Sequence, residues 1–351
     1  PPRSTLFPYT TLFRSIMGKK ALLLGAGGPL GALEAGALMA FDDNNVKFDI
    51  ISGACIGSII ALAYVSPAGN RTGKEGLKLW LEATPVADEI YKAFPINYKV
   101  FQKDGSIFNN YWDAIYPYLF SNPFLTENPQ NEFERIYNDS YIMMVHSMAP
   151  STTNFFSWNM SRITENEINS AIDFERLKTV KQDVYINALN ITKKHIQLFD
   201  KTQITAQHVV AGSSLFYLAK PQEIDGEFFG EGSYVDSLNF KGLLQKHEDI
   251  DKIVVMNILN KDVLIRTPRN IYDAYLLSVF LPFVTIAEDD IKLFELKHKK
   301  PGQKLLKAKF DIPAEMGPTC LDWSYSNFKR LSEIGYKAGE KLVKEYGTDL
   351  L

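Results

Sequence analysis

Short apolar runs alternate with longer amphipathic stretches along this chain. The pattern predicts a buried strand over Lys20–Leu24, a glycine loop, and an alanine- and leucine-rich helix that reaches about Phe41. The order of strand, glycine turn and helix then repeats over Phe48–Ser52 and Ile56–Tyr64. Strands that alternate with helices in this way predict an α/β fold with a mainly parallel sheet.

The downstream pattern extends this sheet. Residues 183–192 are predicted to form a third strand, with residues 193–200 as its hairpin partner. Residues 251–259 are nearly all apolar, as a parallel strand buried on both faces should be. Apolar residues recur at helical spacing over Ser324–Tyr346, which predicts a long amphipathic helix.

Residues 17–351 are predicted to form a single domain that carries two helical additions. The first is an insertion at about residues 85–180, whose central part has nearly twice the chain's average of 13% aromatic residues. This insertion either has a small core of its own or supplies the apolar walls of a substrate pocket. The second is a helical region at about residues 268–350.

The first 16 residues contain a near-repeat, STLFPYT and TTLFRS, and resemble the translation of a sequencing adapter. We therefore expect residues 1–16 to be an artefact that takes no part in the fold. Without Arg3 and Arg14, the formal net charge changes from −3 to −5. This mild acidity predicts that nucleic acid is not a partner.

Cysteine content and hydropathy indicate the cellular compartment in which we expect the protein. Two cysteines do not make a disulfide framework and suit a reducing compartment. The longest apolar run, residues 274–287, has 14 residues and is too short to span a bilayer, so it is either a buried helix or one that contacts lipid. With no signal peptide after Met17, we expect a cytoplasmic protein, with peripheral membrane contact as an open alternative. No His, Cys and acidic cluster has metal-ligand spacing, so neither a metal nor a cofactor is expected.

Three segments carry candidate chemistry, and the first is the loop Gly25–Gly31, GAGGPLG, between a strand and a helix. Its free N–H groups at the positive end of the helix suit a phosphate or a developing oxyanion. A dinucleotide fingerprint is disfavoured because Leu30 stands where that motif has glycine. A loop that only lets strand and helix pack is the other alternative.

The second segment, Ile50–Ser58 (IISGACIGS), has the outline of a nucleophile elbow, G-x-S-x-G, with Cys55 at the serine position. Gly53 and Gly57 flank Cys55 where side chains would obstruct a sharp turn. A helix N-terminus lowers the pKa of a thiol, which predicts a more available thiolate at this position. The alternative is a small buried cysteine that only packs.

The third segment, residues 222–240, contains a predicted hairpin turn and a second glycine loop, GEGSYVD. Its two carboxylates are Glu231 and Asp236. A carboxylate that faces a nucleophile can accept its proton without a histidine. A solvated loop acid is the alternative interpretation.

In this order, the three segments resemble the motifs of the patatin-like phospholipase family. The family's oxyanion loop, G-G-x-R-G, matches GGPLG, its elbow matches GACIG, and its D-G-G motif matches EGS. The resemblance spans about Lys19 to Met256 and implies a three-layer α/β/α sandwich that hydrolyses lipid or other apolar acyl esters. It also implies a dyad of Cys55 and Glu231. It implies that Gly27 and Gly28 form the oxyanion hole. The residues that it implies in the supporting elbow and loops are Gly31, Gly53, Gly57, Gly232 and Asp236.

Four departures from the family's motifs bear on activity. Cys55 replaces serine and Glu231 replaces the dyad aspartate, but both keep competent side chains, which favours an active Cys–Glu dyad over a decayed site. Leu30 replaces arginine, which removes a cation for an anionic head group and favours a less charged ester or thioester. Ser233 replaces the second glycine of the D-G-G motif.

Other hypotheses remain open at this point. His208 precedes the third segment on a predicted helix and is an alternative base, although a structural histidine is the plainer interpretation. A thioester intermediate hydrolyses slowly, so transfer of the acyl group to an alcohol is a second outcome. A silent scaffold that binds lipid or a protein partner, and a nucleotide-binding protein that uses Gly25–Gly31, are the other classes.

Overall fold

The structure is a computed structural model of the 351-residue chain. It describes residues 18–93, 97–100, 122–126, 128–148, 163–216 and 218–350, together with residues 95, 111, 114, 115 and 118. The predicted artefact at residues 1–16 lies outside the described residues, and so does much of the predicted aromatic insertion.

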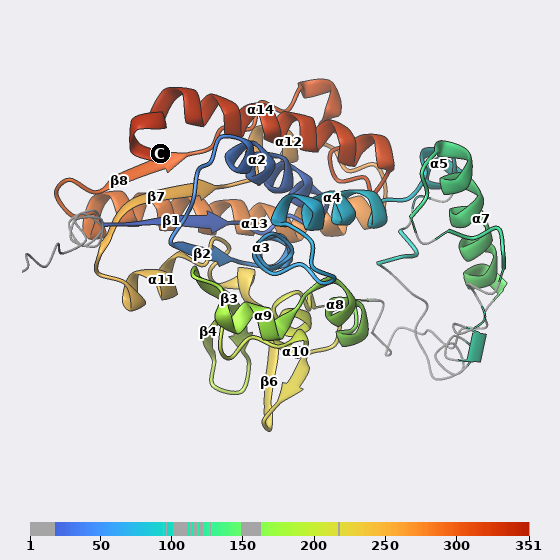
Figure 1. Ribbon diagram of the computed structural model, residues 1–351, viewed down its shortest axis with the longest axis horizontal. Coiled ribbons are helices and arrows are strands. Elements are labelled where there is room, and N and C mark those ends of the chain that lie inside the picture. Colours follow the sequence, from blue (N-terminus) through green and yellow to red (C-terminus); the bar gives the residue numbers. More distant parts are fainter. Residues whose placement is uncertain are drawn as a thin grey trace, which may run out of the picture.

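In the described part of the chain, eight strands form one sheet (Figure 1). The strands are β1 (Lys19–Leu24), β2 (Ile50–Gly53), β3 (Asp183–Asn190), β4 (His195–Asp200), β5 (Gln222–Ile224), β6 (Glu227–Glu231), β7 (Ile250–Met256) and β8 (Lys304–Lys307). Their order is β5-β6-β3-β2-β1-β7-β8, with β4 also paired to β3. The five strands from β3 to β8 in this order are parallel, whereas β4, β5 and β6 pair antiparallel. The predicted mainly parallel sheet is confirmed.

Helices flank this sheet. The α-helices with described bounds are α2 (Gly31–Asp43), α3 (Ile56–Val65), α4 (Gly73–Ala83), α5 (Asp88–Ala93), α7 (Glu132–Met148), α8 (Glu165–Ala171), α9 (Phe174–Thr179), α10 (Ala206–Gly212), α11 (Phe240–Lys246), α12 (Lys261–Leu264), α13 (Ile271–Leu293) and α14 (Tyr325–Leu350). Figure 1 shows α14 lying along α2 on one side of the strands.

Side chains of β1 point alternately into two cores. Leu22 and Leu24 share a core with residues of α2, α3 and α14. Ala21 and Leu23 share the other core with residues of α11 and the second half of α13. Because successive strand residues point to opposite faces, this alternation places a helix layer on each side of the sheet. The three-layer α/β/α sandwich is therefore confirmed.

The strand pairing brings the three predicted segments to one place. β1 ends at the first glycine loop and β2 ends two residues before Cys55, and these two strands are parallel neighbours. Gly53, the last residue of β2, pairs with Ile186 of β3, and Glu231 of β6 pairs with Ala188, two residues further along β3. β6 thus occupies the sheet position just beyond the end of β2, which carries Glu231 to the elbow.

The apolar run at 274–287 forms part of α13, and several of its side chains are buried in the cores. This confirms the buried-helix alternative for those side chains. Within the described residues, no helix is long and apolar enough to cross a membrane.

Candidate active site

Cys55 stands at a strained turn between β2 and α3. Its φ of 53° and ψ of −122° lie in a region that residues with a side chain seldom occupy. A Cβ atom on Gly53 would lie 2.5 Å from the carbonyl oxygen of Gly57, and one on Gly57 would lie 2.5 Å from that of Leu24. The turn therefore requires glycine on both sides of Cys55, which is the geometry of a nucleophile elbow.

Glu231 is the carboxyl partner of this cysteine. It is fully buried at the end of β6, and its Oε1 accepts a hydrogen bond from the Ser233 N–H at 3.0 Å. The thiol of Cys55 also interacts with this carboxyl. Burial outweighs these favourable contacts and raises the pKa of Glu231 to about 7. A base that changes protonation near neutral pH suits proton transfer.

The thiol itself is held neutral. Burial, followed by the negative charge of Glu231, raises the pKa of Cys55 well above its ordinary value. The backbone N–H groups of Ile56 and Gly27 face the sulfur and act in the opposite direction, but they do not outweigh burial. The sequence-based expectation of a lowered thiol pKa is therefore wrong, because it considered the helix N-terminus without the buried carboxyl.

The glycine loop after β1 lies against the elbow. Gly27 presents its N–H to the sulfur, and Gly28, with a φ of +54°, lines the same cavity as Cys55. A buried carboxyl fixes the start of the loop, because Glu34 Oε1 accepts from the Gly25 N–H at 2.6 Å. Burial raises the pKa of Glu34 well above its ordinary value. Nothing in the motif analysis identified Glu34.

Ile56 is a second residue that the motif analysis missed. Its N–H belongs to the residue directly after Cys55, which is where nucleophile elbows place an oxyanion donor. The elbow motif therefore contained the information needed to identify it. With the N–H of Gly27, it gives two backbone donors directed at the atom that would attack.

The remaining predicted loop residues lie in the segments that support the elbow and the glycine loop. Asp236 accepts hydrogen bonds from the N–H groups of Phe240 and Lys241 at 2.8 and 2.9 Å, so it caps α11. Burial raises the pKa of Asp236 to about 6. Gly31 begins α2, and Gly232 directly follows Glu231 in the chain. The Ala26 N–H donates to Ser237 at 3.0 Å and so ties the first glycine loop to the third segment.

His208 has other partners. Its Nδ1 is hydrogen-bonded with the Thr205 hydroxyl at 2.8 Å, and its ring lies 4.3 Å from that of Phe199. Burial lowers its pKa. Among the described residues, no interaction joins His208 to Cys55 or Glu231, so the structure does not bring the alternative base to the dyad.

A cavity adjoins the elbow, and a second cavity shares one of its wall residues. A small apolar cavity of about 70 Å³ lies against Cys55, and its walls include Leu276 and Phe280 of α13 and Trp323. Sequence patterns gave no indication of these three walls, because they come from a helix and a loop more than 200 residues downstream.

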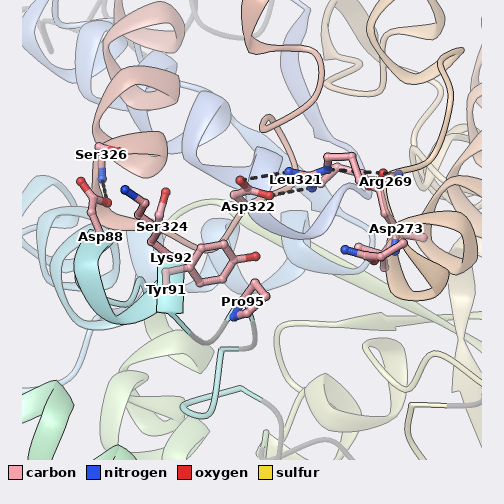
Figure 2. Close-up of a pocket in the computed structure, with 12 residues that line it drawn as sticks. Asp88, Tyr91, Lys92, Pro95, Arg269, Asp273, Leu321, Asp322, Ser324 and Ser326 are labelled. Carbon is pink, nitrogen blue, oxygen red and sulfur yellow. Dashed lines mark hydrogen bonds and ion pairs between the residues drawn. The ribbon is translucent and has the colours of Figure 1, made fainter.

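Leu276 also borders a second, polar cavity of about 380 Å³, shown in Figure 2. There Arg269 pairs with Asp322 at 2.8 Å, and the Ser326 N–H donates to Asp88 at 2.9 Å. Arg269 also contacts Asp273. The chain thus places a polar cavity beside the apolar one.

In the described parts of the chain, no group of three or more His, Cys, Asp or Glu residues is arranged to hold a metal ion.

Comparison with known proteins identifies the family. A family model described as patatin-like phospholipase matches residues 22–244, which include the elbow, the glycine loop and Glu231. No curated protein matches the chain. The fold is similar to that of VipD from Legionella pneumophila, at 14% identity and a TM-score of 0.41, over 93% of this chain and 67% of that one.

Two further similar structures contain the type III effector ExoU. One is ExoU itself, at 11% identity and a TM-score of 0.35, over 93% of this chain and 53% of that one. The other is the ExoU–SpcU complex from Pseudomonas aeruginosa, at 11% identity and a TM-score of 0.30, over 94% and 52%. This chain thus spans about half the length of ExoU. The family match covers well over half of this chain, and the chain belongs to the patatin-like phospholipase family, a family of lipid acyl hydrolases.

Proposed function

We propose that this chain is a lipid acyl hydrolase in which Cys55 is the nucleophile and Glu231 the base. The observation that carries the proposal is the contact between a buried thiol at a strained elbow and a carboxyl whose pKa is about 7. A neutral thiol must lose its proton as it attacks, and this carboxyl is placed to accept it.

The first half-reaction forms an acyl-enzyme. The sulfur of Cys55 bonds to the carbonyl carbon of the ester while Glu231 takes the thiol proton. The carbonyl oxygen becomes an oxyanion, which the N–H groups of Gly27, Gly28 and Ile56 stabilise in this proposal; those of Gly27 and Ile56 face the sulfur, and Gly28 lines the same cavity. The bond to the alcohol then breaks, and the alcohol leaves with the proton from Glu231.

The second half-reaction releases the acid. Glu231 takes a proton from water, the resulting hydroxide oxygen bonds to the thioester carbon, and the carbon–sulfur bond breaks. The sulfur recovers the proton. An alcohol in place of water gives acyl transfer, and the polar cavity beside Leu276 offers hydrogen-bonding groups for the alcohol part of an ester. Such a substrate is amphiphilic and is found at a lipid surface.

The proposal is tested on the full chain with p-nitrophenyl butyrate and a butyryl thioester. Cys55→Ala should lose at least about a thousandfold in kcat/KM. Intact-mass measurement after brief exposure should find one acyl adduct on the wild type, mapped to Cys55. Added glycerol should give a glyceryl ester in the same experiment if transfer competes with hydrolysis.

A silent lipid-binding scaffold is the second candidate, and the raised thiol pKa is what favours it. It predicts no turnover and no adduct in the wild type, with vesicle binding unchanged in Cys55→Ala. Activity that appears only in Cys55→Ser would mean that the rest of the site supports catalysis and that cysteine at position 55 makes it inactive. Either result would overturn the Cys55–Glu231 mechanism.

A further inference from the structure

A larger apolar cavity adjoins the one at Cys55. It measures about 350 Å³ and lies between α3 and α4, with the α8 region as a third wall. The two cavities have five lining residues in common, so they meet at these side chains: Ile56, Ile59, Val100, Ile163 and Trp323. We refer to the two cavities together as the acyl channel.

Helix α3 gives the channel its direction. Cys55 is the N-cap of α3, and Ile56, Ile59 and Ala63 all line the channel. Residues at positions i, i+3 and i+7 lie along one face of a helix. Ile56 and Ile59 border both cavities, whereas Ala63 borders only the larger one. The channel therefore runs along α3 away from the nucleophile, and Ala63 lies at its far part.

Helix geometry sets the length of this path. Ala63 is the eighth residue after Cys55, which corresponds to about 12 Å along the helix at 1.5 Å per residue. A zigzag chain of C–C bonds of about 1.5 Å advances roughly 1.3 Å per methylene. Nine or ten carbons of an acyl chain therefore reach from the sulfur to Ala63.

The larger cavity is not wholly apolar. Its lining includes Arg71, Lys99, Glu167 and Ser170, whereas Leu79 and Trp80 of α4 give it apolar walls. Trp80 is packed against Phe328, with ring centroids 5.4 Å apart, which fixes this wall. Methylenes beyond the apolar stretch would gain little from burial. Ala63 is 5% exposed and contributes only a methyl group, so a longer side chain there would extend into the cavity.

We propose that the acyl channel binds the acyl chain of the substrate and that Ala63 determines how long a chain it accepts, an inference that rests on the proposed function. Each buried methylene should raise kcat/KM roughly threefold to fourfold. The rise should continue to about ten carbons, as estimated from the helix geometry, and then level off.

The test is a series of p-nitrophenyl esters from two to sixteen carbons. In Ala63→Leu, the ratio of kcat/KM for the ten-carbon ester to that for the four-carbon ester should fall at least about tenfold, because leucine fills the volume of several methylenes. Ala314→Leu, an exposed position on a separate turn, is the matched control and should keep the wild-type ratio. Thermal unfolding checks that both variants fold. An unchanged ratio in folded Ala63→Leu would overturn the proposal.

A binding measurement separates this proposal from the catalytic one. In the Cys55→Ala protein, decanoic acid brominated near its methyl end should quench tryptophan fluorescence, and Trp80→Phe should remove part of that quenching. Quenching without esterase activity in the wild type would retain the channel and reject the catalytic mechanism. Esterase activity with a flat chain-length profile and no quenching would support the catalytic mechanism and reject the acyl channel.

Discussion

The Cys55 thiol and the Glu231 carboxyl share a buried site in which each acts on the protonation of the other. The charge of Glu231 contributes to the raised pKa of the thiol, and the contact with the thiol tempers the rise in the pKa of Glu231. The pair therefore rests as a neutral thiol beside a carboxyl that titrates near neutral pH. This arrangement differs from that of a reactive cysteine whose lowered pKa keeps it ionised at neutral pH.

The first prediction concerns the pH dependence of catalysis. Only deprotonated Glu231 can accept the thiol proton, and its pKa is about 7. We therefore expect kcat/KM for a short ester to rise about tenfold per pH unit below pH 7 and to level off above it. Glu231→Gln should lower the plateau by about 10² to 10⁴ and remove the inflection. A profile that rises only above pH 9 would instead indicate that ionisation of the thiol controls the rate.

The second prediction concerns stability, with the sign set by the raised pKa of Glu231. A raised folded-state pKa gives stability that is fully present below the unfolded pKa of about 4.5 and is lost as pH rises through about 7. Glu231→Gln removes this loss. The variant should therefore exceed the wild type by up to about 3 kcal/mol at pH 8, and by much less at pH 5.

Urea unfolding of both proteins at the two pH values measures this difference. Asp236→Asn is a useful comparison, because it removes a second buried carboxyl but also disturbs the cap of α11. A Glu231→Gln variant that is less stable than the wild type at pH 8 would contradict the prediction. If Glu231→Gln is more stable than the wild type but inactive, then the buried carboxyl lowers the stability of the fold while serving the site.

The sequence was sufficient to predict the frame of this site. Glycines on both sides of Cys55 and the apolar runs before each loop specified a strand–turn–helix unit, and the structure has it. The pairing of Glu231 with this unit was available only through the family resemblance. Its physical cause is the register of β6 on β3, which local sequence patterns do not encode.

The protonation states and cavity walls were beyond the reach of sequence patterns. The thiol pKa depends on how deeply Cys55 is buried and on which charge faces it, so the helix N-terminus alone gave the wrong sign. Phe280 of α13 and Trp323, just before α14, reach the elbow through tertiary packing. The predicted role of the aromatic insertion remains a prediction, since much of it lies outside the described residues.

The third prediction uses the strained backbone of Cys55. A φ of 53° with a ψ of −122° is unfavourable for any residue with a Cβ atom and is readily adopted by glycine. Cys55→Gly and Cys55→Ala both remove the sulfur, but only the first relieves the strain. We expect the glycine variant to be more stable by about 1 kcal/mol, measured by urea unfolding. Equal stability, or a more stable alanine variant, would show that the turn is not strained.

The last prediction concerns Glu34, whose carboxyl is bonded to the start of the glycine loop after β1. Its Oε1 accepts from the Gly25 N–H, and burial raises the pKa of this carboxyl well above its ordinary value, which favours the neutral form. Glu34→Gln keeps an acceptor oxygen at this position and carries no charge, so it should unfold within about 1 kcal/mol of the wild type and keep most of the activity.

Glu34→Ala should behave differently, because it leaves a buried N–H without a partner and opens a cavity under the loop. We expect it to lose about 2 to 4 kcal/mol of stability and to lower kcat more than KM, since the oxyanion donors that we propose at Gly27 and Gly28 would act in the transition state. Urea unfolding and steady-state kinetics on the two variants measure this contrast. If Glu34→Ala kept the wild-type kcat while folded, the loop would hold its shape without Glu34, and its position would depend on the Ala26–Ser237 hydrogen bond and the packing of Leu30 instead.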